Sequence, residues 1–315
     1  MKVSVIIPVY NTGNFIIKCL DSLVNNEMKD IEIIIVNDGA TDNSDSIITS
    51  YINKHKDENI VYLKKENGGL SDARNYGVPY ATGEYIAFLD SDDYVSRNLY
   101  QDLLPYMEQN YDMIKYKILR VDEDGDILSE NYSPIFENKS GEEAFEILYK
   151  EDKMTEVAWG YLYRKEFFVQ NNFKYAKGLY HEDFGLTPLV LLKAKKVASI
   201  NIKGYNYMQT SNSITRGNPS TIYKRAMDLL LHYDNMIKQI EKYDISEKSK
   251  ENIKIYYTNC ILLEINNLTS KEDKDKYIKE IKNRRMTNNI KARNCKQLLK
   301  KIILKISIKW YLKLR

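Results

Sequence analysis

Short apolar runs alternate with helix-forming segments over the first hundred residues of this chain. The expected strands are 3–7, 31–36, 60–64 and 85–89. The expected helices between them are 14–25, 42–54 and 70–80. Strands that are apolar throughout and alternate with helices predict a parallel, doubly wound α/β sheet of the Rossmann-like type. In such sheets ligands bind beyond the carboxyl ends of the strands, so the polar residues that follow each strand are the first candidates for a site.

From about residue 100 to residue 216 the pattern is mixed. The expected strands there are 113–121, 159–163 and 197–207, and the expected helices are 141–149, opened by Ser140, and 181–194. After Gly217-Asn218-Pro219, the segments 223–240 and 248–268 read as long helices, and the charged stretch 271–279 as a solvated helix or linker. We therefore expect a catalytic domain over 1–216, with a nucleotide-binding half at 1–99 and an acceptor half at 100–216. A separate helical region is expected over 217–315.

The composition narrows the class of protein. A net charge of +3 is too small to indicate a nucleic-acid binder. The three cysteines are widely spaced and odd in number, which argues against a disulfide framework or a zinc site and favours a reducing cytoplasm. The N-terminus begins with a strand-like run, and no segment offers the ~18 uninterrupted apolar residues of a spanning helix. We expect a cytoplasmic chain that is neither secreted nor inserted in a membrane.

An acidic loop, residues 90–93 (Asp-Ser-Asp-Asp), follows the fourth expected strand. Hard cations such as Mg²⁺ and Mn²⁺ prefer oxygen ligands, and Mg²⁺ is usually held by one or two carboxylates together with substrate phosphates. The loop therefore suggests a metal-bound nucleoside diphosphate. An acidic turn or a helix N-cap is the alternative, and Asp93 suits the cap.

Two other strand ends carry candidate ligands. Residues 8–11 (Pro-Val-Tyr-Asn) place main-chain groups and an aromatic ring where a base can stack, although a plain proline-containing turn explains them too. Asp38 precedes Gly39 and can accept a hydrogen bond from an imide N–H such as that of uracil. Asp42 is better explained as a cap of the next helix.

The third strand end is Asn67-Gly68-Gly69, which runs into a helix that carries Arg74 one turn later. Two glycines permit close backbone approach to a ligand, and a helix start attracts anions. Arg74 can face a pyrophosphate or order the acidic loop. A surface arginine or an ordinary salt bridge is an equally good explanation from the sequence alone.

Taken in order, segments 4–11, 36–42, 67–75 and 88–93 closely resemble the family 2 glycosyltransferases of the GT-A fold. The resemblance implies that Asp92 binds Mg²⁺ or Mn²⁺ and that Asp90 lies near the ribose and the metal. It also implies that Asp38 reads uracil. Asn37 and Ala40 stand where many relatives have Asp and Ser. The donor-binding residues expected on this basis are Pro8, Val9, Tyr10, Asn11, Asp38, Asn67, Gly69, Arg74, Asp90, Ser91 and Asp92.

The resemblance extends to a Glu-Asp pair in the second half of the domain. It implies that Asp183 is the general base and Glu182 an acceptor ligand, although acids in a first helical turn also complement the helix dipole. Trp159 resembles an aromatic residue that stacks on acceptor sugars, and core packing explains it almost as well. His181 receives no role. Segments 205–209 and 213–216 resemble a part that closes over the donor; Met208 stands where relatives often have Arg, which leaves Arg216 for any phosphate contact.

The tail 291–315 contains basic residues, no acidic residues and interleaved apolar ones. Such a helix can lie on an anionic membrane surface or dock on the helical region, and both alternatives stay open.

The sequence thus predicts an inverting, metal-dependent glycosyltransferase that uses a nucleotide-sugar donor. A UDP-sugar is the expected donor. The expected acceptor is a hydroxyl of a glycan or lipid-linked oligosaccharide in bacterial surface polysaccharide synthesis. The alternatives are a sugar nucleotidyltransferase, whose Gly-rich and Arg-containing phosphate loop is replaced here by residues 8–11, and a catalytically inactive scaffold. The oligomeric state is left open.

Overall fold

The computed structural model describes residues 1–13, 15–209, 221–290 and 295–308. The chain divides into two compact units. The first, the catalytic unit, comprises Met1–Gly178 and Leu186–Ser213, and the second, the helical unit, comprises Leu179–Gly185 and Ile214–Arg315. The boundary near residue 185 falls within one helix, α7 (Glu182–Lys193).

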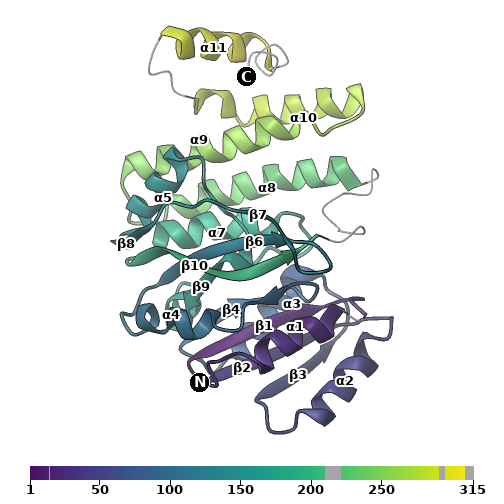
Figure 1. The fold of residues 1–315 in the computed structure, drawn as a ribbon. Helices are drawn as coiled ribbons and strands as arrows, with labels where there is room; N and C mark the ends of the chain where they lie inside the picture. The colour runs from purple at the N-terminus through teal and green to yellow at the C-terminus, as the bar shows by residue number, and fades with distance from the viewer. Residues whose placement is uncertain (14, 210–220, 291–294, 309–315) are drawn as a thin grey trace. The chain divides into compact units, whose positions relative to one another are not determined.

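The first half of the catalytic unit is a parallel sheet, as the apolar runs predict (Figure 1). Its strands are β1 (Val3–Val9), β2 (Ile31–Asp38), β3 (Ile60–Lys65) and β4 (Tyr85–Phe88). The helices between them are α1 (Phe15–Val24), α2 (Ser44–Lys54) and α3 (Leu70–Gly77), which continues into the short 3₁₀ helix η1 (Val78–Tyr80). The spatial order β3-β2-β1-β4 reverses the direction of travel between β1 and β4, which is where such sheets bind ligands.

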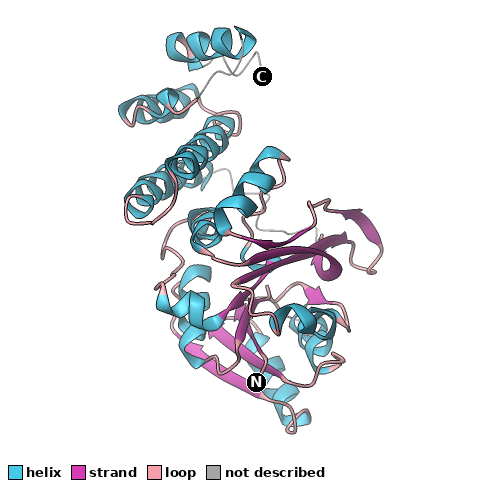
Figure 2. Ribbon diagram, turned by 90° about the vertical axis from the view of Figure 1, so that its left-hand side faces the viewer, coloured by secondary structure: helices cyan, strands magenta, loops and turns pink. Residues whose placement is uncertain are grey.

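Helices cover both faces of this sheet (Figure 2). Val3, Val5 and Ile7 lie in the main hydrophobic core with residues of α1 and α2. The intervening Ile6 faces α3, where a Cβ on Gly77 would lie only 2.6 Å from the Ile6 side chain. Because alternate strand residues point to opposite faces, strands buried on both sides must be apolar throughout, and β1 is.

The second half makes the sheet mixed rather than wholly parallel. β9 (Tyr161–Arg164) runs antiparallel between β4 and β6 (Met113–Val121), and β10 (Val197–Met208) is parallel to β6. The expected strand at 159–163 begins later because Ala158–Gly160 forms the 3₁₀ turn η2. The short strands β5 (Tyr94–Val95), β7 (Ile127–Glu130) and β8 (Phe136–Lys139) carry no apolar run that predicts them. The remaining helices are α4 (Leu99–Met107), α5 (Gly141–Lys150) and α6 (Lys165–Gln170).

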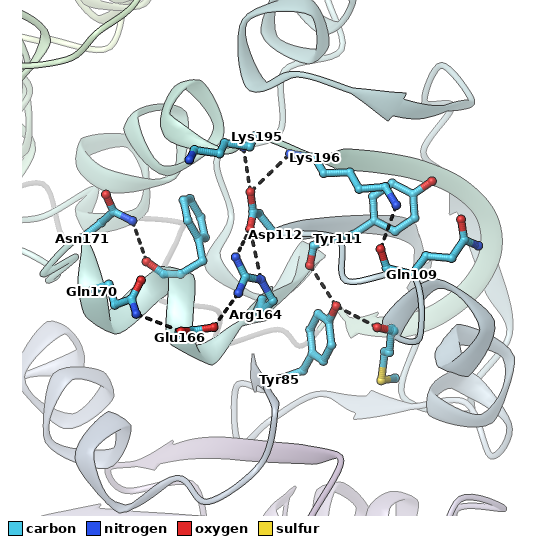
Figure 3. Close-up of polar contacts among 12 residues, drawn as sticks. Tyr85, Gln109, Tyr111, Asp112, Arg164, Glu166, Gln170, Asn171, Lys195 and Lys196 are labelled. Atoms are coloured by element: carbon cyan, nitrogen blue, oxygen red, sulfur yellow. Dashed lines mark hydrogen bonds and ion pairs between the residues drawn. The ribbon is translucent and has the colours of Figure 1, made fainter.

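Buried Asp112 joins three parts of this half (Figure 3). One carboxylate oxygen accepts from the Arg164 guanidinium at 2.5 and 3.1 Å, at the end of β9. The other accepts from the backbone N–H groups of Lys195 and Lys196 at 2.7 and 3.2 Å, just before β10. Asp112 therefore fixes the ends of β6, β9 and β10 relative to one another.

The helical unit contains α8 (Ile222–Ile240), α9 (Glu247–Glu264), α10 (Lys271–Asn283), the 3₁₀ turn η5 (Met286–Asn288) and α11 (Cys295–Ile306). Its interior is apolar and rich in tyrosine, with Tyr233, Tyr257 and Tyr277 buried. Figure 1 shows α8, α9 and α10 stacked side by side. Within the described residues, no helix combines the length and the apolar character that crossing a membrane requires.

Candidate functional site

The acidic loop follows β4 at the switch between β1 and β4. Asp92 is mostly buried, and this burial, followed by the negative charge of Asp90, raises the pKa of Asp92 to about 6. The raised pKa means that the charged form of the Asp92 carboxylate is destabilised here without a compensating cation. A divalent ion reverses this penalty, so the donor set of Asp90 and Asp92 fits such an ion.

Protein groups alone do not complete a metal site in the described part of the chain, where no three His, Cys, Asp or Glu residues are grouped to hold an ion.

Arg74 lies beneath the acidic loop rather than on the surface. Its side chain is 2% exposed, and its Nη2 lies 2.7 Å from a carboxylate oxygen of Asp90. Its guanidinium also stacks over the ring of Tyr175, 5.4 Å from the centroid. Of the roles considered for Arg74, the structure supports the ordering of the acidic loop through an ion pair.

Asp93 is buried, and the expectation that it caps a helix is wrong because the next element is the strand β5. One carboxylate oxygen accepts from the Tyr205 hydroxyl at 2.5 Å, and the other accepts from the Met208 backbone N–H at 2.8 Å. Burial and the charges of Asp92 and Asp90 raise the pKa of Asp93 above its ordinary value. Asp93 thus links the acidic loop to β10.

Asp38 is buried at the end of β2 and organises the turn before α3. Its carboxylate accepts from the backbone N–H groups of Gly68 and Gly69 at 3.0 and 2.7 Å and from the Lys65 ammonium at 2.5 Å. Gly69 has a φ of 85°, a left-handed conformation that favours glycine. The two predicted donor-binding segments are therefore joined. The reading of uracil by Asp38 stays a prediction.

The end of β1 approaches the turn after β2. Pro8 and Val9 lie within β1, while the Tyr10 side chain is 50% exposed and available for stacking. The Asn11 side-chain oxygen accepts from the backbone N–H of Thr41 at 2.8 Å. The N-cap position of α2 is Asn43 rather than Asp42, so the expectation that Asp42 is the cap is wrong. Asp42 lies one residue earlier, and its carboxylate accepts from the backbone N–H of Ser44, the first residue of α2, at 3.0 Å.

Two further predicted donor residues, Asn67 and Ser91, differ in their placement. A Cβ on Gly39 would lie 2.8 Å from the Asn67 backbone nitrogen, so the turns after β2 and β3 are in close contact. Ser91 is buried within the acidic loop and presents little surface to a ligand.

Trp159, a predicted acceptor residue, lies in the hydrophobic core. Its ring stacks on Tyr205 with centroids 4.1 Å apart and is 5.4 Å from the centroid of Tyr207. The Tyr116 hydroxyl donates to its carbonyl at 2.7 Å. Of the two explanations that the sequence left open for Trp159, core packing and stacking on an acceptor sugar, the structure supports core packing.

Glu182 and Asp183 open α7, as expected, and both are partly buried. The segment before them is held by α8: the backbone N–H of Tyr180 donates to Asp228 at 2.9 Å, and its carbonyl lies 2.9 Å from the His232 ring nitrogen. From α9, the Tyr257 hydroxyl donates to the Phe184 carbonyl at 2.6 Å. The helical region is therefore not separate from the candidate base, because residues 179–185 belong to it.

His181 precedes the pair in a left-handed conformation, with a φ of 59°. Burial and then the charge of Arg225 lower the pKa of His181 to about 4, so the imidazole is neutral near pH 7. Of the segment expected to close over the donor, residues 205–208 form the end of β10, whereas 213–216 lie outside the described residues.

Comparison with known proteins identifies the family. A family model described as glycosyl transferase family 2 matches residues 4–170, more than half of the chain. The chain belongs to the family 2 glycosyltransferases. This family 2 glycosyltransferase is 34% identical to EpsJ, an uncharacterised glycosyltransferase of Bacillus subtilis, over 270 residues that cover 81% of this chain and 74% of EpsJ.

Longer relatives match over part of their length. Glycosyltransferase GlyA of Streptococcus pneumoniae is 36% identical over 234 residues, covering 68% of this chain and 32% of GlyA, so the chain spans about a third of that relative. The minor teichoic acid biosynthesis protein GgaB of Bacillus subtilis is 42% identical over 109 residues, covering 34% of this chain and 12% of GgaB. This family 2 glycosyltransferase therefore has relatives in teichoic acid synthesis.

Solved structures show the same GT-A fold. Staphylococcus aureus TarS, residues 1–349 in complex with UDP-GlcNAc, has a TM-score of 0.72 at 20% identity, covering 92% of this chain and 82% of that one. The mannosyltransferase PcManGT of Pyrobaculum calidifontis, in complex with GDP-Man and Mn²⁺, has a TM-score of 0.57 at 16% identity, covering 99% and 82%. Our prediction of the family and fold is confirmed.

Proposed function

We propose that this glycosyltransferase is inverting and metal-dependent. It transfers a sugar from a nucleotide donor, with UDP as the carrier, to a hydroxyl of a glycan or a lipid-linked oligosaccharide. The setting is the synthesis of a bacterial surface polymer, which the likeness to GgaB supports.

The observation that carries this proposal is the acidic loop at the β1–β4 switch. Two carboxylates, Asp90 and Asp92, lie in one loop, and Arg74 pairs with the first of them. Burial, and then the negative charge of Asp90, raises the pKa of Asp92, and a bound cation would stabilise the charged form of this carboxylate. PcManGT, of similar fold, is a complex with Mn²⁺, which supports Mg²⁺ or Mn²⁺ for this chain.

Asp92 would hold the ion, and Asp90 would hold it or the ribose. When bound, the ion supplies positive charge for the leaving diphosphate. The N–H groups of Gly68 and Gly69 already donate to Asp38, so the start of α3 would supply the further N–H groups near the diphosphate.

The nucleoside would lie at the ends of β1 and β2. The half-exposed Tyr10 ring offers a stacking surface. Asp38 Oδ2 accepts one hydrogen bond in the described residues and has a further lone pair for an imide N–H. The UDP-GlcNAc complex of TarS supports uracil, whereas the GDP-Man complex of PcManGT makes guanine the main competitor.

On the acceptor side, Asp183 would take the proton from the attacking hydroxyl, and Glu182 would bind the acceptor. The proton moves from the acceptor hydroxyl to a carboxylate oxygen of Asp183 while the acceptor oxygen bonds to the anomeric carbon. The sugar–phosphate bond breaks on the opposite side, which inverts the anomeric configuration.

The test uses the purified full chain with a panel of UDP-, GDP- and dTDP-sugars, with Mn²⁺ or with EDTA. UDP binding that requires the metal is expected, followed by transfer once an acceptor is supplied. Asp92→Asn should remove metal-dependent UDP binding. Asp183→Asn should keep that binding and lower transfer at least 100-fold, in line with the usual contribution of a general base.

Asp124→Asn is the matched control for Asp92→Asn because Asp124 is an exposed carboxylate in a turn of the same catalytic unit. It should behave as the unmodified chain. Full transfer by a folded Asp92→Asn or Asp183→Asn protein contradicts the assignment, and preferential binding of a GDP-sugar contradicts the choice of uracil.

We also propose that the 291–315 tail places the protein at the inner face of the cell membrane, on anionic lipid. The segment has nine basic and no acidic residues. Within it, α11 buries Leu304, and Ile308 just beyond the helix is buried too, while Leu299, Ile302 and Ile306 are 46 to 73% exposed. Positions 299, 302 and 306 form one stripe of a helix. Burial of Leu304 supports packing of α11 on its own unit, and the exposed stripe supports contact with a membrane, so one helix can serve both alternatives.

Vesicle sedimentation tests this second proposal. The full chain should bind phosphatidylcholine vesicles containing 30% phosphatidylglycerol about tenfold better than pure phosphatidylcholine, and less well in high salt because screening weakens charge attraction. The triple Ser variant of Leu299, Ile302 and Ile306 should lose this binding. The double Ser variant of Ile127 and Leu128, equally exposed in the catalytic unit, is the control. Equal binding to both vesicle types, or self-association through α11, rejects the proposal.

A further inference from the structure

The acidic loop is held at both ends by one tyrosine hydroxyl. The Tyr205 hydroxyl donates to the Asp93 carboxylate at 2.5 Å and accepts from the Asp90 backbone N–H at 3.3 Å. Asp90 and Asp93 also close on each other, because the Asp93 N–H donates to the Asp90 carbonyl at 3.0 Å. The carboxylates of the proposed metal site therefore lie in a turn whose first and last residues share one anchor.

The anchor itself is rigidly placed. Tyr205 is wholly buried in β10, and its ring stacks on Trp159 with an interplanar angle of 14°. A ring packed in a core has few alternative rotamers, so its hydroxyl keeps one position. The second oxygen of Asp93 accepts from the Met208 N–H, three residues further along β10. The position of the loop is thus fixed by β10, which pairs with β6 and β5.

We propose that Tyr205 is a positioning residue for the metal and diphosphate. Through Asp93 and the Asp90 backbone, it fixes the turn in which Asp90 and Asp92 present their carboxylates together. This inference rests on the proposed function, since it assumes that these two residues bind the metal. The Tyr205 hydroxyl bonds the Asp93 carboxylate and the Asp90 backbone N–H rather than the carboxylates of Asp90 and Asp92. Its loss should therefore weaken metal-dependent binding in addition to any loss of protein stability.

Tyr205→Phe removes only the hydroxyl and keeps the ring on Trp159. Tyr116→Phe is a close control: Tyr116 is buried in the same core, and its hydroxyl donates to the Trp159 carbonyl at 2.7 Å without touching the acidic loop. Both variants lose a buried hydroxyl, so their midpoints of thermal unfolding should fall. They differ in whether the acidic loop loses its anchor.

The measurement is UDP binding by calorimetry as a function of Mn²⁺ concentration. Tyr205→Phe should raise the half-saturating Mn²⁺ concentration about tenfold or more, as expected for hydrogen bonds that involve a charged group. Tyr116→Phe should leave it within about twofold, the range of a substitution remote from the site. Equal Mn²⁺ dependence in the two variants overturns the proposal.

Asp93→Asn provides a second test if Tyr205→Phe does not fold. The amide keeps the shape of the carboxylate but cannot accept at both oxygens, so one of the two β10 hydrogen bonds is lost and the Mn²⁺ requirement should rise. An unchanged requirement in folded Asp93→Asn contradicts the proposal. The unmodified chain distinguishes a failure of the Tyr205 proposal from a failure of the proposed function. If the unmodified chain shows no Mn²⁺-dependent UDP binding, both proposals are rejected.

Discussion

Arg74 of α3 and Asp90 after β4 form an ion pair with 2.7 Å between Nη2 and a carboxylate oxygen. Arg74 is 2% exposed and Asp90 is 25% exposed, so the pair is buried on one side and reaches solvent on the other. One member is thus a fixed positive charge beneath the loop, and the other remains accessible to a ligand. A buried arginine and a carboxylate proposed to bind the metal are here parts of the same contact.

Arg74→Met removes this positive charge at similar side-chain length. We expect the free energy of unfolding to fall by about 3 kcal/mol because a partly buried pair is broken. Metal-dependent UDP binding should weaken at least tenfold because the loop loses its support. Urea unfolding and calorimetry measure the two effects. Arg97→Met is the control: Arg97 is 78% exposed, lies 3.7 Å from Glu27 and should change stability by no more than about 0.5 kcal/mol.

Asp112→Ala should destabilise the catalytic unit without changing the chemistry of the site. It leaves the Arg164 guanidinium and two backbone N–H groups without their acceptor, which should lower the free energy of unfolding by about 3 kcal/mol. Glu166→Ala removes an exposed partner of the same arginine and should cost less than about 1 kcal/mol. Similar urea midpoints for the two variants contradict the central role of Asp112.

Lys115 gives a pH-dependent prediction. It is 3% exposed in β6, and burial lowers the pKa of Lys115 from 10.5 to about 8. Below pH 8 the lysine is charged in both the folded and the unfolded chain, and the fold bears the full cost of the buried charge. Between pH 8 and 10.5 the folded chain loses the proton first, so this cost shrinks and stability rises with pH.

Lys115→Met removes the charge at similar length. At pH 7 the variant should be more stable than the unmodified chain by about 3 kcal/mol, the free energy of a shift of this size. This difference should narrow between pH 8 and 10.5. Urea unfolding of both proteins across that range measures it, and comparing the two cancels the titration of other groups. A constant difference across the range contradicts the prediction.

Asp228 of α8 gives a prediction about the candidate base. Asp228→Ala removes the acceptor of the Tyr180 N–H, close in sequence to Asp183, and transfer should fall about tenfold while UDP binding is kept. Asp234→Ala is the matched control because Asp234 lies in the same helix and pairs with Arg284, away from residues 179–185. If both variants lose transfer equally, general destabilisation of the helical unit explains the loss.

Much of the donor side follows from the sequence because parallel strands bring their carboxyl ends to one edge. Asp38 and Gly69 lie 31 positions apart, yet they are hydrogen-bonded because β2 pairs with β3. A strand end is a local signal, and its neighbours follow from topology. Ser140 was equally predictable as a helix-start residue, and it caps α5 as expected.

The rest depends on contacts that leave no pattern. Tyr205 and Asp93 are 112 positions apart, and a tyrosine inside a strand reads as an ordinary core residue. Asp93 reads as a cap because Asp is among the residues most common at the N-cap of a helix. The grouping of residues 179–185 with the helical unit rests on Asp228 and His232, whose partners are backbone atoms of Tyr180 and so have no side-chain signature.

The pairing of β5 with β10 has a consequence for how the protein is made. The acidic residues are synthesised early, but Tyr205, Met208 and the β10 partner of β5 come more than a hundred positions later. A nascent chain that ends at β4 holds the carboxylates without the groups that orient them. Contacts this distant in sequence form late in folding. A fragment cut at residue 99 should therefore lack an ordered acidic loop, and completion of the proposed cation site should coincide with completion of the catalytic unit.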